Sequence, residues 1–157
     1  MWSFFVRLLH QFTHMIRYVR GKVEVKWFPK KASAAMSANT FGAYSAAGLM
    51  TFATATSTEI AGLLLRTITS ADDDYATANV MIPVLVGDEN TVWEYDGDAH
   101  NATELMNGEF VDITSASVIN GGASSLEVIK VEKYISATKL EFSIPKKSGV
   151  AASTNAD

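Results

Sequence analysis

The segment Lys22–Phe28, KVEVKWF, decides the fold class, because its side chains alternate strictly in character. Val23, Val25 and Trp27 fall on one face of an extended chain, and the three charged residues between or before them fall on the other. A period of two residues is typical of a strand with one buried face, so we expect the apolar side chains to point inward. Pro29 ends this strand.

Six more runs of strand-forming residues follow along the chain, separated by turn-forming residues. They are 63–65, 80–86, 91–95, 110–113, 126–134 and 139–144. Because the GDEN stretch at 87–90 has the length and composition of a hairpin turn, we expect 80–86 to pair with 91–95. The pattern predicts an all-β fold, a small β-barrel or sandwich of about seven short strands.

The chain divides into three parts by composition. Its 157 residues fit one domain, which we place at residues 22–145, and residues 146–157 lack apolar periodicity and are expected to be a flexible tail. The sequence has no cysteine, so disulfides, thiolate metal ligands and cysteine nucleophiles are excluded. Only 19% of residues are charged against 48% hydrophobic, which indicates that part of the surface is covered in an assembly.

Residues 1–21 predict an amphipathic, basic N-terminal arm. Phe5, Leu9, Phe12 and Ile16 recur at helical spacing. Cations and histidines interrupt the apolar run, which argues against a signal peptide and against a membrane span, so the helix is expected to lie on a partner or on a membrane surface. Translation from Met15 is an alternative that would remove most of this arm.

The charge of the chain is divided between its two ends. Residues 1–31 carry seven cations and one anion, a net charge of +6, so the whole-chain charge of -4 leaves -10 for residues 32–157. The cations either solvate the arm or dock it on an acidic surface or nucleic acid, and the sequence leaves both alternatives open. His10 and His14 have the spacing of a zinc-protease motif, but Gln11 stands where the catalytic glutamate would be.

No sequence motif predicts catalysis or cofactor binding. The nucleophile elbow, the phosphate-binding loop and the dinucleotide-binding fingerprint are all missing from the sequence. Asp72, Asp73 and Asp74 form the densest acidic cluster, which we interpret as a solvated turn, with calcium binding or a charged contact with a basic partner as alternatives. His100 is expected in a second solvated loop, at 96–103. We therefore expect a protein that is not an enzyme and that has no cofactor or metal.

The region from residue 22 to 145 resembles small structural proteins of tailed bacteriophages. The elements that carry the resemblance are a lysine-led strand end, a G-x-[LMIV] step, an A-G-[LV]-x-L segment, a T-I-x-[AS]-x-D-x-D-Y-A stretch and a final I-P-V. In this sequence they are Lys30 with Lys31, 48–50, 61–65, 67–76 and 82–84.

The resemblance implies a capsid decoration, or cement, protein that binds the outside of a phage head and stabilises it. It further implies the major capsid protein as partner, a homo-oligomer with a trimer favoured, location on the virion surface and no direct contact with nucleic acid. Membrane contact by residues 1–21 is a lesser expectation. The candidate partner-contact residues are Arg17, Arg20, Lys30, Lys31, Asp72, Asp73, Asp74, Tyr75 and Trp93.

Two alternative functions remain open at this point. One is a tail or head-to-tail joining protein built on the same β module. The other is a membrane-surface or carbohydrate-binding module, which would use the N-terminal helix or the aromatic residues Trp93 and Tyr95, which we expect to be exposed.

Overall fold

Two antiparallel β-sheets make up nearly all of the regular secondary structure in the computed structural model, which describes residues 15–146. The six-stranded sheet contains, in spatial order, β1 (Met15–Arg20), β7 (Val92–Asp96), β11 (Lys139–Ser143), β10 (Ile129–Ser136), β8 (Phe110–Ser115) and β9 (Val118–Asn120). The five-stranded sheet contains β2 (Val23–Pro29), β6 (Met81–Gly87), β5 (Gly62–Leu64), β3 (Phe41–Tyr44) and β4 (Met50–Phe52). A single 3₁₀ turn, η2 (Glu104–Met106), is the helical element of the described residues. The all-β prediction is therefore confirmed.

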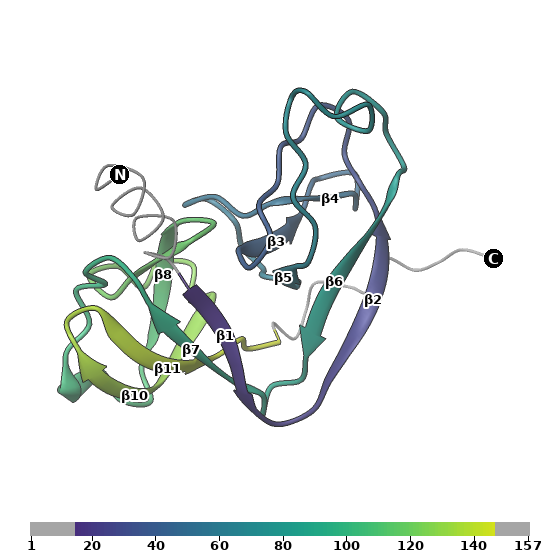
Figure 1. The fold of residues 1–157 in the computed structure, drawn as a ribbon. Coiled ribbons are helices and arrows are strands. Elements are labelled where there is room, and N and C mark those ends of the chain that lie inside the picture. Colours follow the sequence, from purple (N-terminus) through teal and green to yellow (C-terminus); the bar gives the residue numbers. More distant parts are fainter. Residues whose placement is uncertain (1–14, 147–157) are drawn as a thin grey trace, which may run out of the picture.

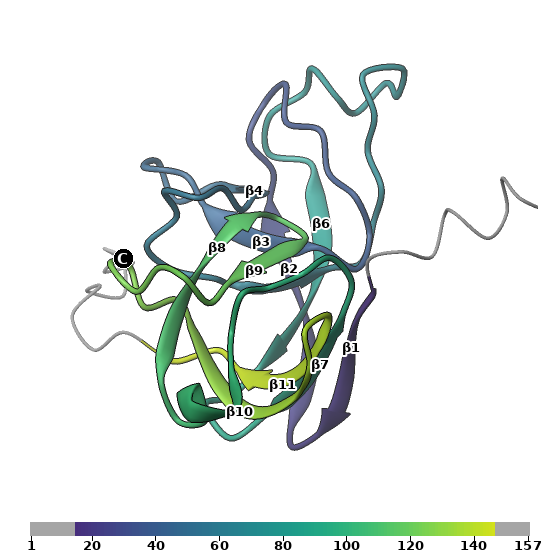
Figure 2. The same cartoon turned by 90° about the vertical axis from the view of Figure 1, so that its left-hand side faces the viewer.

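The main hydrophobic core lies between the two sheets. Phe41 of β3 meets Phe142 of β11 edge to face, with ring centroids 5.7 Å apart, so an aromatic pair joins the sheets directly. Trp93 and Tyr95 of β7 are fully buried in the same cluster. Figure 2 shows the strands β1, β7, β11 and β10 side by side, with the five-stranded sheet behind them.

A second, smaller core lies on the other face of the five-stranded sheet. It contains Ile82 and Val84 of β6 and Leu64 of β5, which pack against Met36 and Ile68 from two long connections. Met36 and Ile68 also exchange backbone hydrogen bonds of 2.9 Å, so the connections at 30–40 and 65–80 support each other. Figure 1 shows these connections projecting together beyond the ends of β2 and β6.

The chain passes from one sheet to the other at two adjacent turns. Gly21 joins β1 to β2, and residues 88–91 join β6 to β7. Gly21 has φ +109°, and a Cβ atom built there would lie 2.7 Å from the Cα atom of Thr91, so this crossing requires glycine. The Thr91 hydroxyl donates a hydrogen bond of 2.6 Å to the Lys22 carbonyl, which ties the two turns together.

The expected pairing of 80–86 with 91–95 is wrong. β6 pairs with β2 and β5, whereas β7 pairs with β1 and β11 in the other sheet. The reason is that the 88–91 turn directs the chain around the corner instead of back along β6, so a turn of hairpin length connects two sheets. The number of strands also exceeds the expected seven, because short strands in the Ala- and Ser-rich region and at β9 have little sequence periodicity.

The prediction of a helical N-terminal arm is wrong for its last residues. Residues 15–20 form β1 rather than a helix, and Ile16 is buried in the main core beside Tyr95, its partner across the strands. The remainder of the predicted helix, with His10 and His14, and the tail from residue 147 lie outside the described residues.

Candidate functional site

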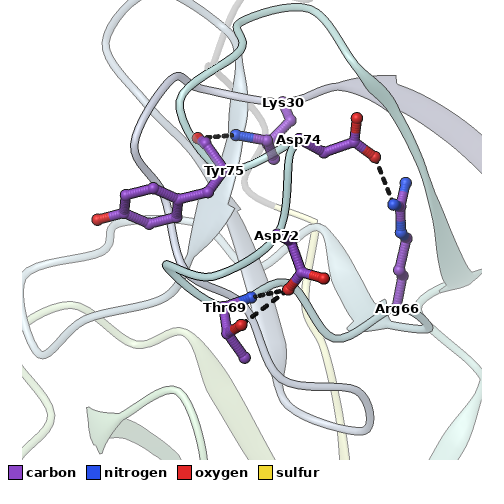
Figure 3. A network of polar contacts seen from close by, with 6 residues as sticks. All are labelled: Lys30, Arg66, Thr69, Asp72, Asp74 and Tyr75. Carbon is purple, nitrogen blue, oxygen red and sulfur yellow. Dashed lines mark hydrogen bonds and ion pairs between the residues drawn. The ribbon is translucent and has the colours of Figure 1, made fainter.

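The acidic triplet lies in the long connection between β5 and β6, in a turn that its first member builds. One carboxylate oxygen of Asp72 accepts hydrogen bonds from the backbone N–H of Thr69 at 2.6 Å and from the Thr69 hydroxyl at 2.8 Å (Figure 3). The Tyr75 N–H donates in turn to the Asp72 carbonyl at 2.9 Å. The Thr69 N–H, followed by the Thr69 hydroxyl, holds the pKa of Asp72 below its ordinary value. Asp72 therefore acts as the cap of this turn, as short polar side chains do in loops.

Lys30 holds the same connection through hydrogen bonds from its buried side chain. Its side chain is completely buried, and its Nζ donates to the Lys31 carbonyl oxygen at 2.7 Å. The same Nζ donates to the Tyr75 carbonyl oxygen at 2.9 Å (Figure 3). Burial lowers the pKa of Lys30, and the nearby Asp74 carboxylate acts in the opposite direction. Lys30 is therefore a structural anchor and does not offer its charge to a partner.

The two remaining carboxylates of the triplet differ in their surroundings. Asp74 forms an ion pair with Arg66, whereas Asp73 is exposed and has no ion pair or hydrogen bond within residues 15–146. The Tyr75 side chain is half-buried and packs against the second core. Among the three, Asp73 is thus the carboxylate that faces solvent with its charge uncompensated. The described residues contain no group of three or more His, Cys, Asp or Glu side chains that could hold a metal ion.

Arg17 and Arg20 lie on the outer face of the six-stranded sheet, away from the acidic loop. Arg17 pairs with Glu94 at 2.6 Å and Arg20 with Glu141 at 3.1 Å, and Lys139 also approaches Glu94 at 3.3 Å. Such partly exposed pairs contribute about 0 to 1 kcal/mol each, so their main effect is to neutralise the basic side chains. Lys31, by contrast, is exposed beside the acidic loop.

Trp93 and Tyr95 are completely buried, so the expectation that they are exposed is wrong. Trp93 contacts Tyr18 edge to face within the six-stranded sheet, and its indole Nε1 has no hydrogen-bond partner among residues 15–146. The Tyr95 hydroxyl donates to the Asp98 carbonyl at 3.0 Å. Neither side chain is available to bind a carbohydrate or a membrane, because both fill the core between the sheets.

The expectation of a solvated loop around His100 is also wrong for the histidine itself. His100 is fully buried between the rings of Tyr95 and Tyr134, with centroids 6.0 Å from each. Its Nδ1 accepts from the Ala102 N–H at 3.0 Å, so its Nε2 carries the proton and donates to the Ser136 carbonyl at 2.8 Å. Both ring nitrogens serve the local structure.

Two features were missed by the sequence patterns. The first is Asp112, a buried carboxylate that accepts four hydrogen bonds from residues 125–127 and orders that connection. The second is the exposure of the apolar face of β2, where Val25 is 51% and Trp27 is 59% exposed. The alternation had placed these side chains correctly on one face, but it had predicted that this face is buried.

The open hollows of the protein differ in their linings, and one of about 250 Å³ includes Lys26, Glu59 and Lys146. Another of about 460 Å³ is lined by Ala, Ser and Thr with Met36 and Phe52, and contains no ionisable side chain. The candidate residues as a group divide into an acidic loop anchored on Lys30, a neutralised pair of arginines and one core tryptophan. The arrangement exposes the Asp73 carboxylate at an acidic tip of the 65–80 connection, and the apolar side chains Val25 and Trp27 on β2. Both are features suited to binding.

Comparisons with known proteins found no match to this chain among family models, curated proteins or solved structures. The class defined by the coordinates is an all-β protein of two antiparallel sheets. None of the helical segments in residues 15–146 has the length and apolar character needed to span a membrane.

Proposed function

We propose that this protein is a virion structural protein that binds the outside of a bacteriophage capsid and stabilises it. The observation that supports the proposal is that elements of the sequence which resemble those of small phage structural proteins contact one another in the fold. Lys30 from the end of β2 binds the Tyr75 carbonyl at the end of the acidic stretch, and β6 with its Ile-Pro-Val follows directly. Two of the elements that carry the resemblance, Lys30 with Lys31 and 67–76, therefore build one anchored, projecting loop, and the others lie at β4, β5 and β6.

The acidic tip supplies the proposed contact with the capsid. Asp72, Asp74 and Tyr75 shape the loop, and Asp73 presents its carboxylate to solvent next to the other two. An exposed carboxylate steers binding toward a basic surface and sets orientation, while apolar contacts supply most of the affinity. A binding role of this kind needs no catalytic group. The trimer that the resemblance implies is an alternative to the dimer proposed in the next subsection, and sedimentation distinguishes the two.

Binding to heads is the test of this proposal. Purified protein is added to phage heads that lack it, and co-sedimentation and the temperature of DNA release are measured. We expect saturable binding and a higher release temperature. Absence of this chain from purified particles, together with no binding to heads, would contradict the proposal.

A charge reversal tests the acidic tip separately. Asp73→Lys is expected to weaken binding about tenfold or more without changing the thermal stability of the free protein, because Asp73 has no partner within the described residues. Glu89→Lys is the matched control, since Glu89 is exposed in the turn at the opposite end of β6 and the change in net charge is identical. Equal binding by both variants would show that the tip is not the contact.

A further inference from the structure

The outer edge of β2 has the properties of a strand that pairs with another strand. β2 is the terminal strand of its sheet in the described part of the chain, with β6 as its neighbour. Lys30 donates its N–H to the Val80 carbonyl on the β6 side, and Lys26 and Phe28 share this orientation because hydrogen bonding alternates along an antiparallel strand. The N–H and C=O groups of Val23, Val25 and Trp27 therefore point away from β6, toward the open edge. Figure 1 shows β2 along one margin of the fold.

An uncovered apolar surface continues from this edge across the sheet. Val25 and Trp27 lie opposite Leu85 and Pro83 of β6, on the same face as Met81. Val25, Trp27 and Met81 are 51%, 59% and 47% exposed. Clustered exposed apolar side chains beside a free strand edge mark an interaction surface or an aggregation hazard.

The charges on the opposite face of β2 identify a second copy of the same chain as the occupant. If two copies of β2 pair antiparallel about a two-fold axis at Val25, Glu24 of each copy lies opposite Lys26 of the other. Val25 then meets its own copy, and Val23 meets Trp27 on the apolar face. Registers centred on Glu24 or on Lys26 instead place that charged residue opposite its own copy, which is unfavourable.

We propose that two copies of this protein associate through antiparallel pairing of their β2 edges, in the register centred on Val25. Pairing joins the two five-stranded sheets into one continuous sheet and covers Val25 and Trp27. Pro29, which has no N–H, stands at the end of the strand and limits the pairing to the preceding residues. This inference concerns contacts between copies of the chain and does not depend on binding to a capsid.

Charge exchange in the full-length protein tests both the interface and its register. Sedimentation velocity from about 1 to 100 μM covers the range expected for an interface of this limited size. We expect a wild-type dimer, and dissociation constants at least about tenfold weaker for Glu24→Lys and for Lys26→Glu, because each variant places like charges opposite each other. A mixture of the two variants is expected to form heterodimers of wild-type affinity, since every Lys then faces a Glu.

The mixture separates pairing from a structural role of the two residues. Glu24 and Lys26 also form an exposed ion pair of 3.0 Å within one chain, and mixing cannot restore that contact. A monomeric wild type at all concentrations would overturn the proposal. So would a trimer, or a dimer that the single variants do not weaken, or a mixture that fails to associate.

Amide hydrogen exchange tests whether another segment of the same chain occupies the edge. In the dimer, the N–H groups of Val23, Val25 and Trp27 are expected to exchange slowly, and in the Glu24→Lys variant at low concentration they are expected to exchange fast. If these amides were equally protected in the monomeric variant, a terminal segment of the same chain would cover the edge and the proposal would be wrong.

Discussion

Replacing Asp112 by asparagine isolates the effect of one buried carboxylate on a long connection. Asp112 lies on β8 with only 4% of its surface exposed. One oxygen accepts from the N–H groups of Leu126 at 2.9 Å and Glu127 at 2.7 Å, and the other accepts from the N–H and hydroxyl of Ser125, both at 3.0 Å. Glu127 has a positive φ of 54°, so these bonds hold a backbone shape that is otherwise unfavourable.

The expected loss follows from these contacts. The amide of asparagine retains one oxygen for Leu126 and Glu127, but its NH₂ group faces the Ser125 N–H and leaves that donor without an acceptor. An unsatisfied buried donor costs about 1 to 3 kcal/mol, and each charge-assisted bond that becomes neutral weakens by about 1 kcal/mol. Relief of the buried charge offsets part of this, so we expect Asp112→Asn to lower the free energy of unfolding by about 2 to 4 kcal/mol at neutral pH.

The loss is expected to depend on pH. Burial alone would raise the pKa of Asp112, but the hydrogen bonds from Leu126, Glu127 and Ser125 outweigh it and hold the pKa below its ordinary value. This carboxylate therefore stabilises the fold above its ordinary pKa, and the contribution disappears as the pH falls through the lower folded-state pKa.

Urea unfolding of wild type and variant measures both effects. The difference in free energy of unfolding between the two is expected to shrink as the pH falls from 7 through the folded-state pKa of Asp112, because the wild-type carboxyl then becomes neutral as well. Glu109→Gln, at an exposed carboxylate, is the matched control. A loss below about 0.5 kcal/mol at pH 7, the size of an ordinary surface substitution, would refute the reasoning, as would a loss that does not change with pH.

Three further predictions concern single positions. Lys30→Met should lower the free energy of unfolding by about 1 to 3 kcal/mol, because the Lys31 carbonyl loses its donor. The exposed control Lys31→Met should be neutral in the same urea titration, and equal effects would show that the buried lysine is unimportant. Burial, followed by the Asp98 charge, raises the pKa of Tyr95 to about 12. The neutral Tyr95 hydroxyl should therefore stabilise the fold below the ordinary tyrosine pKa, and this contribution should be lost as the pH rises toward about 12. An ultraviolet titration should show this late phase, and its persistence in Tyr95→Phe would contradict the assignment. Gly21→Ala should destabilise the protein by at least about 2 kcal/mol, because both the positive φ and the approach to Thr91 oppose a Cβ atom; an unchanged thermal midpoint would argue against the close crossing.

Local patterns in the sequence predicted individual strands well. In the run 139–144, KLEFSI, Leu140 and Phe142 alternate with polar residues, which predicts that both point inward, and both are fully buried. The run 126–134 has two apolar phases, Leu126 with Val128 and Ile129 with Val131, which predict a bulge or burial on both faces, and β10 has register shifts on its pairing with β11. Alternation succeeds because the direction of a side chain along a strand depends only on its immediate neighbours in the chain.

The candidate site was predicted in part. The sequence placed the acidic triplet in a turn beside Tyr75, as the structure has it, because short polar residues favour turns through their own side-chain hydrogen bonds. It did not show that Lys30 is buried beneath that turn or that Trp93 fills the core. Both facts depend on segments that are distant in the sequence and adjacent in space.

The sequence by itself determined that this protein is an all-β protein with an acidic loop, and that Val23, Val25 and Trp27 share one face of a strand. Only the tertiary structure decided that the loop is tied down by a buried lysine, that β6 and β7 belong to different sheets, and that β2 lies at an edge with Val25 and Trp27 uncovered. The physical reason is that alternation fixes which side chains lie together, whereas the covering of a face depends on the positions of distant strands. Here the distant strands leave that face open.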